Sequence, residues 1–204
     1  MYYRSIVLAG AITLAFCVPT AEAQERWQGL YGGIAIAGQN VTANVERSAI
    51  HRYSEDALSL GVYGGKNFVS ANGFVWGPDV LLTSLSTPGA RRGEGLGTTS
   101  FRGSFLLSPR VRLGFATDNV MFYGVLGAGI TDATVRSAGR GDGGKIIARA
   151  AYGVGMEFAT SELWSVRAEA VTYNLNVDDR SFGFRTRDID GDIGQISIGL
   201  SRKF

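Results

Sequence analysis

The chain has 204 residues and a formal net charge of +2, from 20 basic and 18 acidic side chains. Because the charges nearly balance and form no long basic block, we expect no nucleic-acid partner. Glycine is abundant, with 29 residues, proline is scarce, with 4, and the single cysteine excludes an intrachain disulfide.

The N-terminus has the organisation of a secretory signal. Arg4 precedes an apolar run from Ile6 to Val18, and Ala21-Glu22-Ala23 forms a small-residue cleavage site. The run is shorter than the roughly 20 residues of a spanning helix. We therefore predict a cleaved signal peptide at residues 1–23 and one exported domain at residues 24–204.

The exported chain contains segments in which apolar and polar residues alternate, as they do in half-buried strands. Eight such segments cover residues 28–38, 57–68, 74–84, 100–115, 120–131, 146–159, 163–174 and 194–204. Short turns at 69–73, 116–119 and 160–162 alternate with long polar connections at 39–56, 85–98, 132–145 and 175–193. This alternation is typical of outer-membrane barrels with short periplasmic turns. We predict an all-β fold, an eight-stranded antiparallel up-and-down transmembrane β-barrel.

The alternation alone does not say which face meets lipid, because a soluble ligand-carrying barrel would turn its apolar face inward. Aromatic residues near the short turns and the termini favour lipid on the outside, since such residues form girdles at membrane interfaces. The expected girdle consists of Trp27, Phe68, Phe74, Trp76, Phe115, Phe122, Phe158, Trp164 and Phe204.

The face opposite the apolar one carries charged residues of both signs. They are Asp79, Arg102, Arg110, Arg112, Arg149, Glu157, Arg167 and Glu169. Eight strands enclose an interior just wide enough to fill with side chains, so we expect these charges to pair and to plug the lumen against ion flow. The alternative is a charged constriction in a small diffusion pore.

Several motifs resemble those of small OmpA-like outer-membrane proteins. They are the run from Ser108 to Asn119, Phe122-Tyr123-Gly124, Gly153 to Phe158 and Val166-Arg167-Ala168-Glu169. The resemblance spans nearly the whole exported chain. It implies a barrel of the Gram-negative outer membrane that contacts lipid and lipopolysaccharide, maintains envelope integrity and displays surface loops.

The same resemblance implies an assembly signal in the last strand, read by the barrel assembly machinery. Phe204, Leu200 and Ile198 fit the pattern of a C-terminal aromatic residue preceded by alternating apolar residues. Arg202 departs from the pattern, because an aromatic or apolar residue is usual at its position.

Two motifs in the long connections indicate other functions. The only histidine, His51, lies near Ser48, Ser54 and Asp56, but nucleophilic catalysis requires a base and an orienting group that this spacing does not specify, so we expect no enzyme. Arg140-Gly141-Asp142 resembles an integrin ligand. It makes a surface adhesin, binding a host surface or other envelope proteins, the second alternative to the structural role.

The acidic residues Asp188, Asp190 and Asp192 are spaced like part of a calcium loop. The remaining ligands of that motif, including its bidentate glutamate, are absent from the sequence that follows. We therefore predict no metal and no cofactor.

Overall fold

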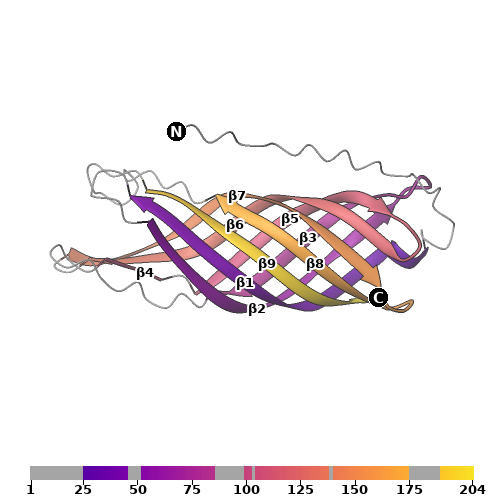
Figure 1. Cartoon of the computed structure of the whole chain (residues 1–204), viewed down its shortest axis with the longest axis horizontal. Coiled ribbons are helices and arrows are strands. Elements are labelled where there is room, and N and C mark those ends of the chain that lie inside the picture. The colour runs from indigo at the N-terminus through magenta and orange to yellow at the C-terminus, as the bar shows by residue number, and fades with distance from the viewer. Residues whose placement is uncertain (1–24, 46–51, 86–98, 103, 138–139, 175–188) are drawn as a thin grey trace, which may run out of the picture.

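The computed structural model describes residues 25–45, 52–85, 99–102, 104–137, 140–174 and 189–204. A short helical segment at residues 25–27 precedes the strands. The strands are β1 (Gly29–Val45), β2 (Arg52–Val69), β3 (Phe74–Ser84), β4 (Thr99–Arg102), β5 (Phe105–Ala116), β6 (Val120–Ser137), β7 (Arg140–Ala159), β8 (Trp164–Asn174) and β9 (Ile189–Lys203). All pairs are antiparallel, in the sheet order β4-β6-β5-β3-β2-β1-β9-β8-β7, and the additional β6–β7 pair closes the sheet into a barrel (Figure 1).

Strands β4 and β5 occupy one position in the barrel wall, because both pair with β6. Arg102 lies opposite Thr134 and Leu106 opposite Thr131, so one extra residue is accommodated on the β4–β5 side, as in a β-bulge. The Asp132 carboxylate accepts hydrogen bonds from the backbone N–H groups of Ser104 (2.7 Å) and Phe105 (3.2 Å) at this break. The barrel is therefore eight-stranded, and the predicted fold class is confirmed.

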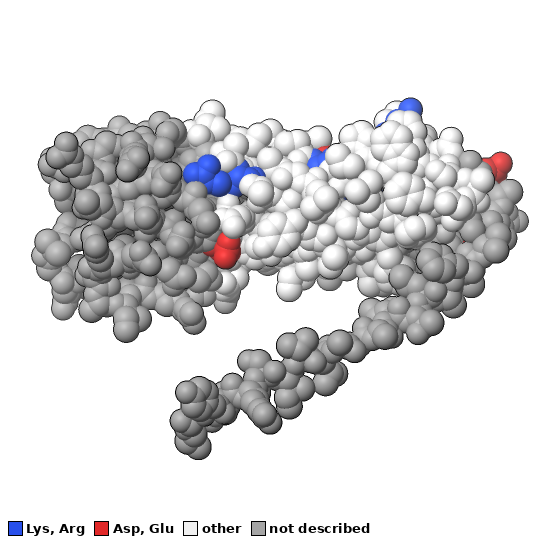
Figure 2. Space-filling model, turned by 90° about the horizontal axis from the view of Figure 1, so that it is seen from above, with Lys and Arg blue, Asp and Glu red and all other residues white. Residues whose placement is uncertain are grey.

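Side chains along each strand alternate between the lumen and the outer surface. In β3 every second residue from Val75 to Thr83 is buried, whereas Trp76, Val80 and Leu82 are exposed. On the face seen in Figure 2, charged side chains are sparse over the middle of the wall. The helices of the described residues contain no segment long and apolar enough to cross a membrane.

The strands run further than predicted at the end of the barrel opposite the short turns. The third long connection, expected at residues 132–145, is the clearest difference, because β6 and β7 stay paired as far as Ser137 opposite Arg140. A hairpin in water forms its backbone hydrogen bonds without needing one apolar face. This part of β6 and β7 therefore lacks the alternation of apolar and polar residues by which the other strand segments were predicted. The paired ends of β6 and β7 at Ser137 and Arg140 and the short strand β4 extend beyond the barrel rim (Figure 1).

Candidate functional site

All eight positions of the barrel wall send polar side chains to one level of the lumen. The charged members, which we call the lumen network, are Asp79, Arg110, Arg112, Glu157, Arg167 and Glu169, and each is at most 4% exposed. They come from β3, β5, β7 and β8, where they occupy the inward positions of the two-residue period. Strands β1, β2 and β6 add Tyr31, Tyr63 and Tyr123, and β9 adds Ser201.

One half of the lumen network is centred on Arg110, which bridges two carboxylates. Its Nε donates to Asp79 Oδ2 at 3.0 Å, its Nη2 also bonds Asp79, and its Nη1 donates to Glu169 Oε2 at 3.1 Å. Arg167 joins the same acids, with Nη1 3.3 Å from Asp79 and Nη2 3.6 Å from Glu169. Two arginines and two carboxylates thus neutralise one another across the lumen.

The other half consists of Arg112 and Glu157. Arg112 Nη2 donates to Glu157 Oε2 at 2.6 Å, and Ser165 Oγ donates to the other oxygen of that carboxylate. The Arg112 guanidinium also lies 3.8 Å from the ring centroid of Tyr123 and 5.1 Å from that of Tyr31. Planar arginine side chains stack favourably on aromatic faces, so the rings support this cation in a site without bulk water.

The tyrosines link the two halves, and the sequence reasoning did not identify them. The Tyr31 hydroxyl donates to Asp79 and the Tyr123 hydroxyl donates to Glu169, both at 2.8 Å. Tyr63 shares a 2.7 Å hydrogen bond with Ser201 and lies beneath Arg167, whose guanidinium is 3.3 Å from its ring centroid. The alternation of inward and outward residues along these strands places the three tyrosines on the inward face, and this alternation was the signal that could have identified them.

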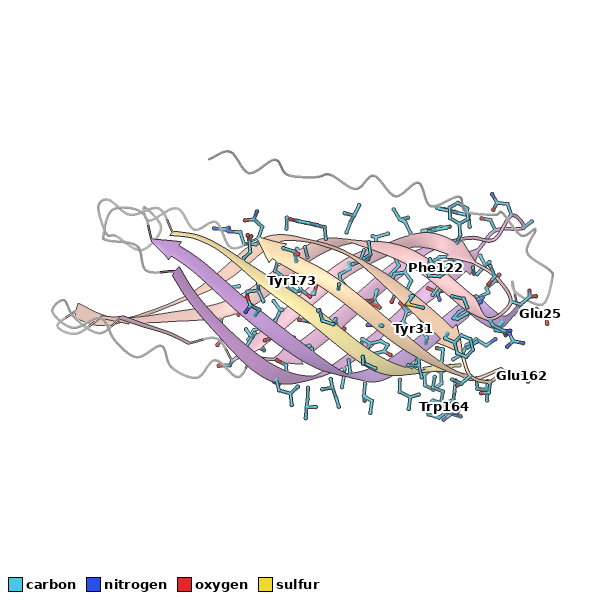
Figure 3. All side chains as sticks on the ribbon, in the orientation of Figure 1. Glu25, Tyr31, Phe122, Glu162, Trp164 and Tyr173 are labelled. Atoms are coloured by element: carbon cyan, nitrogen blue, oxygen red, sulfur yellow. The ribbon has the colours of Figure 1, made fainter. Side chains whose placement is uncertain are left out.

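Glycines on neighbouring strands make room for these rings. A Cβ atom at Gly155 would lie 2.5 Å from the Tyr123 ring, and one at Gly199 would lie 2.7 Å from the Tyr63 hydroxyl. No real Cβ approaches so closely, so glycine is required for the tyrosines to lie flat against the wall. Figure 3 shows Tyr31 and Tyr173 inside the barrel and Phe122 and Trp164 outside it.

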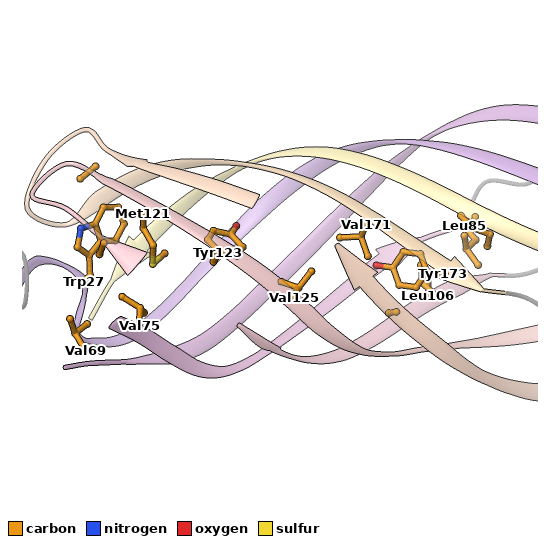
Figure 4. Close-up of a cluster of buried hydrophobic side chains, with 14 residues drawn as sticks. Trp27, Val69, Val75, Leu85, Leu106, Met121, Tyr123, Val125, Val171 and Tyr173 are labelled. Atoms are coloured by element: carbon orange, nitrogen blue, oxygen red, sulfur yellow. The ribbon is translucent and has the colours of Figure 1, made fainter. Parts of the chain in front are cut away.

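Apolar side chains fill the lumen on both sides of the lumen network (Figure 4). Trp27, Val69, Val75 and Met121 form a layer at the end with the short turns, and Leu85, Leu106, Val171 and Tyr173 form a layer at the other end. The cavity at the short-turn mouth, lined by Trp27 and Tyr31 among others, has a volume of about 30 Å³, which is close to that of one water molecule.

The position of Trp27 corrects the predicted girdle. Trp27 is 5% exposed and its Nε1 donates to the carbonyl of Thr117 at 2.8 Å. Trp27 precedes β1, so the alternation of inward and outward residues along a strand does not determine its direction. Its side chain lies inside the mouth of the barrel. The other girdle residues face outward; Phe68 stacks on Trp76 at 4.6 Å, and Phe74 meets Phe115 edge-on at 5.5 Å.

Two arginines predicted for the lumen are not placed in the network. Arg149 is partly exposed and donates to the carbonyl of Ala148 at 3.0 Å, because it lies nearer the outer rim than the six network residues. Arg102 belongs to β4, whose side chains lie outside the described residues.

The structure locates some of the remaining candidates and leaves others outside the described residues. Arg140, Gly141 and Asp142 lie in β7, although a long loop was expected there. His51 and Ser48 lie outside the described residues. Phe204, Leu200 and Ile198 are 75%, 41% and 64% exposed on the outer surface.

In the part of the chain that the structure describes, no group of three or more His, Cys, Asp or Glu residues could hold a metal ion.

The family model described as outer membrane protein beta-barrel domain matches residues 8–204. Among solved structures, Ail, the attachment invasion locus protein of Yersinia pestis, in complex with the heparin analogue sucrose octasulfate, is 17% identical. The match covers 86% of this chain and 99% of Ail, with a TM-score of 0.53. Neisserial surface protein A is 14% identical over 86% of this chain and 97% of its own, with a TM-score of 0.54. These likenesses concern the fold.

One curated protein, a fucose-specific lectin of Aspergillus fumigatus, is 30% identical over 89 residues. The match takes in 44% of this chain but spans only 28% of the length of the lectin. So small a part of the lectin does not indicate a shared function.

Proposed function

The chain belongs to the outer-membrane β-barrel family, and we propose that it is a structural surface protein of the Gram-negative envelope whose lumen is closed to ions. The observation that carries this proposal is the lumen network, in which three arginines and three carboxylates pair across the interior. Outer-membrane lipid and lipopolysaccharide would surround the apolar wall.

Energetics support the closed lumen. Breaking a buried ion pair leaves an uncompensated charge, so opening a water column through the lumen network would require several pairs to separate and rehydrate together. The apolar layers that contain Trp27 and Tyr173 fill the lumen further on the two sides of the network. The protein would therefore act through its wall and its outer surface.

Conductance tests this function directly. We expect the refolded chain from Gln24 to Phe204 to give no current steps in a planar bilayer at several voltages. A general porin in the same bilayer shows that pores are detected, and protease protection confirms insertion. Steady, reproducible steps from the inserted protein would contradict the closed lumen and favour the diffusion-pore alternative.

A second candidate function, adhesion, is favoured by the paired hairpin of β6 and β7. This hairpin carries the backbone of Arg140, Gly141 and Asp142 close to its tip, beyond the barrel rim (Figure 1). Ail, which shares the fold, is named the attachment invasion locus protein of Yersinia pestis. Under this hypothesis Asp142→Ala reduces binding of cells that display the barrel to host cells, whereas undiminished binding would exclude the motif.

The barrel assembly machinery is the proposed partner during biogenesis. Leu200 and Ile198 lie on the outer surface of β9, and Phe204 follows directly after that strand. Replacing Phe204 with Ala is expected to lower the amount of folded barrel in the outer membrane without preventing folding into pure lipid vesicles. Equal losses in cells and in vesicles would assign Phe204 to stability rather than to recognition.

A further inference from the structure

Arg202, the residue that departs from the assembly pattern, is exposed on the outer surface of β9 at the short-turn end of the barrel. Its guanidinium lies 5.8 Å from the ring centroid of Trp164 and 5.5 Å from that of Phe204. Among the described residues, no carboxylate forms an ion pair with it. Figure 3 shows Trp164 on the outside of this end of the barrel.

Lys66 is a second exposed cation at the same end. It lies on β2 with its Nζ 5.0 Å from the ring centroid of Phe68. Arg202 pairs with Gly32 on β1, Gly32 pairs with Gly64 on β2, and Lys66 is two residues beyond Gly64. From strand spacings, the two cations start from backbone positions roughly 10–12 Å apart.

Next to Arg202 the wall carries no side chains on the two following strands, because Gly32 and Gly64 occupy these outward positions, and the exposed side chain of Leu30 lies beside Lys66. A Cβ atom on Gly32 would meet only ordinary contacts, the nearest being the Phe204 ring at 3.6 Å. The C-terminal ring therefore lies beside Gly32, and Arg202 lies between this ring and Trp164.

An apolar groove begins in the next row of side chains toward the middle of the wall. That row runs across four paired strands through Leu200, Ile34, Val62 and Leu82. These residues line an open groove with a volume of about 820 Å³. Adjacent outward residues on one strand are separated by roughly 6–7 Å, so Arg202 lies one such step beyond this row, next to Leu200, and Lys66 lies two steps beyond it, past Gly64.

We propose that the strip formed by Arg202, Lys66, Gly32, Gly64 and the adjoining apolar groove binds an anionic phospholipid of the periplasmic leaflet. The short turns mark the periplasmic end in barrels of this kind, and the exposed aromatic residues mark the level of the lipid headgroups. The phosphate would lie between Arg202 and Lys66, where guanidinium and ammonium groups donate to its oxygens, while an acyl chain follows the groove. Two exposed cations beside an apolar groove are complementary to a negative headgroup on a hydrocarbon tail.

Native mass spectrometry of the detergent-solubilised processed protein tests the site. The protein is offered equal amounts of phosphatidylglycerol and phosphatidylcholine with identical acyl chains, and we expect it to retain phosphatidylglycerol in excess. The ratio of bound phosphatidylglycerol to bound phosphatidylcholine should fall about fivefold for each cation removed. One cation is removed in Arg202→Gln, and two are removed in the double variant that adds Lys66→Gln. Arg202→Lys, which keeps the charge, should retain the preference.

Arg26→Gln is the matched control, because Arg26 is a cation at the same mouth that donates to Asn119 at 3.1 Å and lies outside the strip. Its lipid ratio should equal that of the unchanged protein, and heat-modifiable gel migration establishes that every variant is folded. A ratio near one in the unchanged protein, or the same ratio in folded Arg202→Gln, would overturn the proposal. An equal fall in Arg26→Gln, or displacement of phosphatidylglycerol by purified lipopolysaccharide, would do so as well.

Discussion

Replacing Asp79 with Asn removes the most connected carboxylate of the lumen network. Asp79 accepts from Arg110, from Arg167 at 3.3 Å and from Tyr31 at 2.8 Å, and its side chain is fully buried. The substitution leaves three buried arginines with two carboxylates. Because removing one partner of a buried pair strands the other charge, we expect the free energy of unfolding to fall by about 3–5 kcal/mol.

The assay is urea unfolding of the barrel in lipid vesicles, followed by tryptophan fluorescence and gel migration. Glu162→Gln, which removes an exposed carboxylate in the β7–β8 turn, is the matched control and should change stability by less than about 0.5 kcal/mol. Arg110→Met added to Asp79→Asn restores neutrality and should recover part of the loss. A loss below about 1 kcal/mol for Asp79→Asn, with no recovery in the double variant, would refute the idea that the pairs hold the lumen together.

Three further substitutions test other parts of the barrel. Val154→Arg places a charge on a lipid-facing side chain that is 66% exposed, and should cost about 2–4 kcal/mol in vesicles if the site is near midplane; normal folding would contradict the orientation of the wall. Gly155→Leu forces the Tyr123 ring aside and should cost roughly 1–3 kcal/mol in urea unfolding, whereas Gly124→Ala, with contacts no closer than 3.8 Å, should cost far less. Trp27→Ala should lower stability by roughly 3 kcal/mol yet leave single-channel recordings silent, because the lumen network still closes the interior; current steps would assign closure to Trp27.

The direction in which the charged residues point and the partners with which they pair have different origins. Their inward direction followed from the two-residue period, because a strand that turns Leu113 outward necessarily turns Arg112 inward. Which arginine meets which acid did not follow, since Arg110 pairs both with Asp79, its neighbour in the β3–β5 register 31 residues away, and with Glu169, which is 59 residues away and lies across the lumen. Pairing across the lumen depends on the stagger of the closed barrel, which no local pattern encodes.

The sequence by itself determined the β-barrel, its eight wall positions and the division of side chains between lipid and lumen, because period-two patterning and turn chemistry are local properties. Only the tertiary structure decided that Trp27 fills the mouth, that tyrosines lie over glycines, and that β6 and β7 stay paired to Ser137 and Arg140. Each of these depends on contacts between distant strands or on backbone pairing in water, where the apolar alternation that reveals a strand is not required.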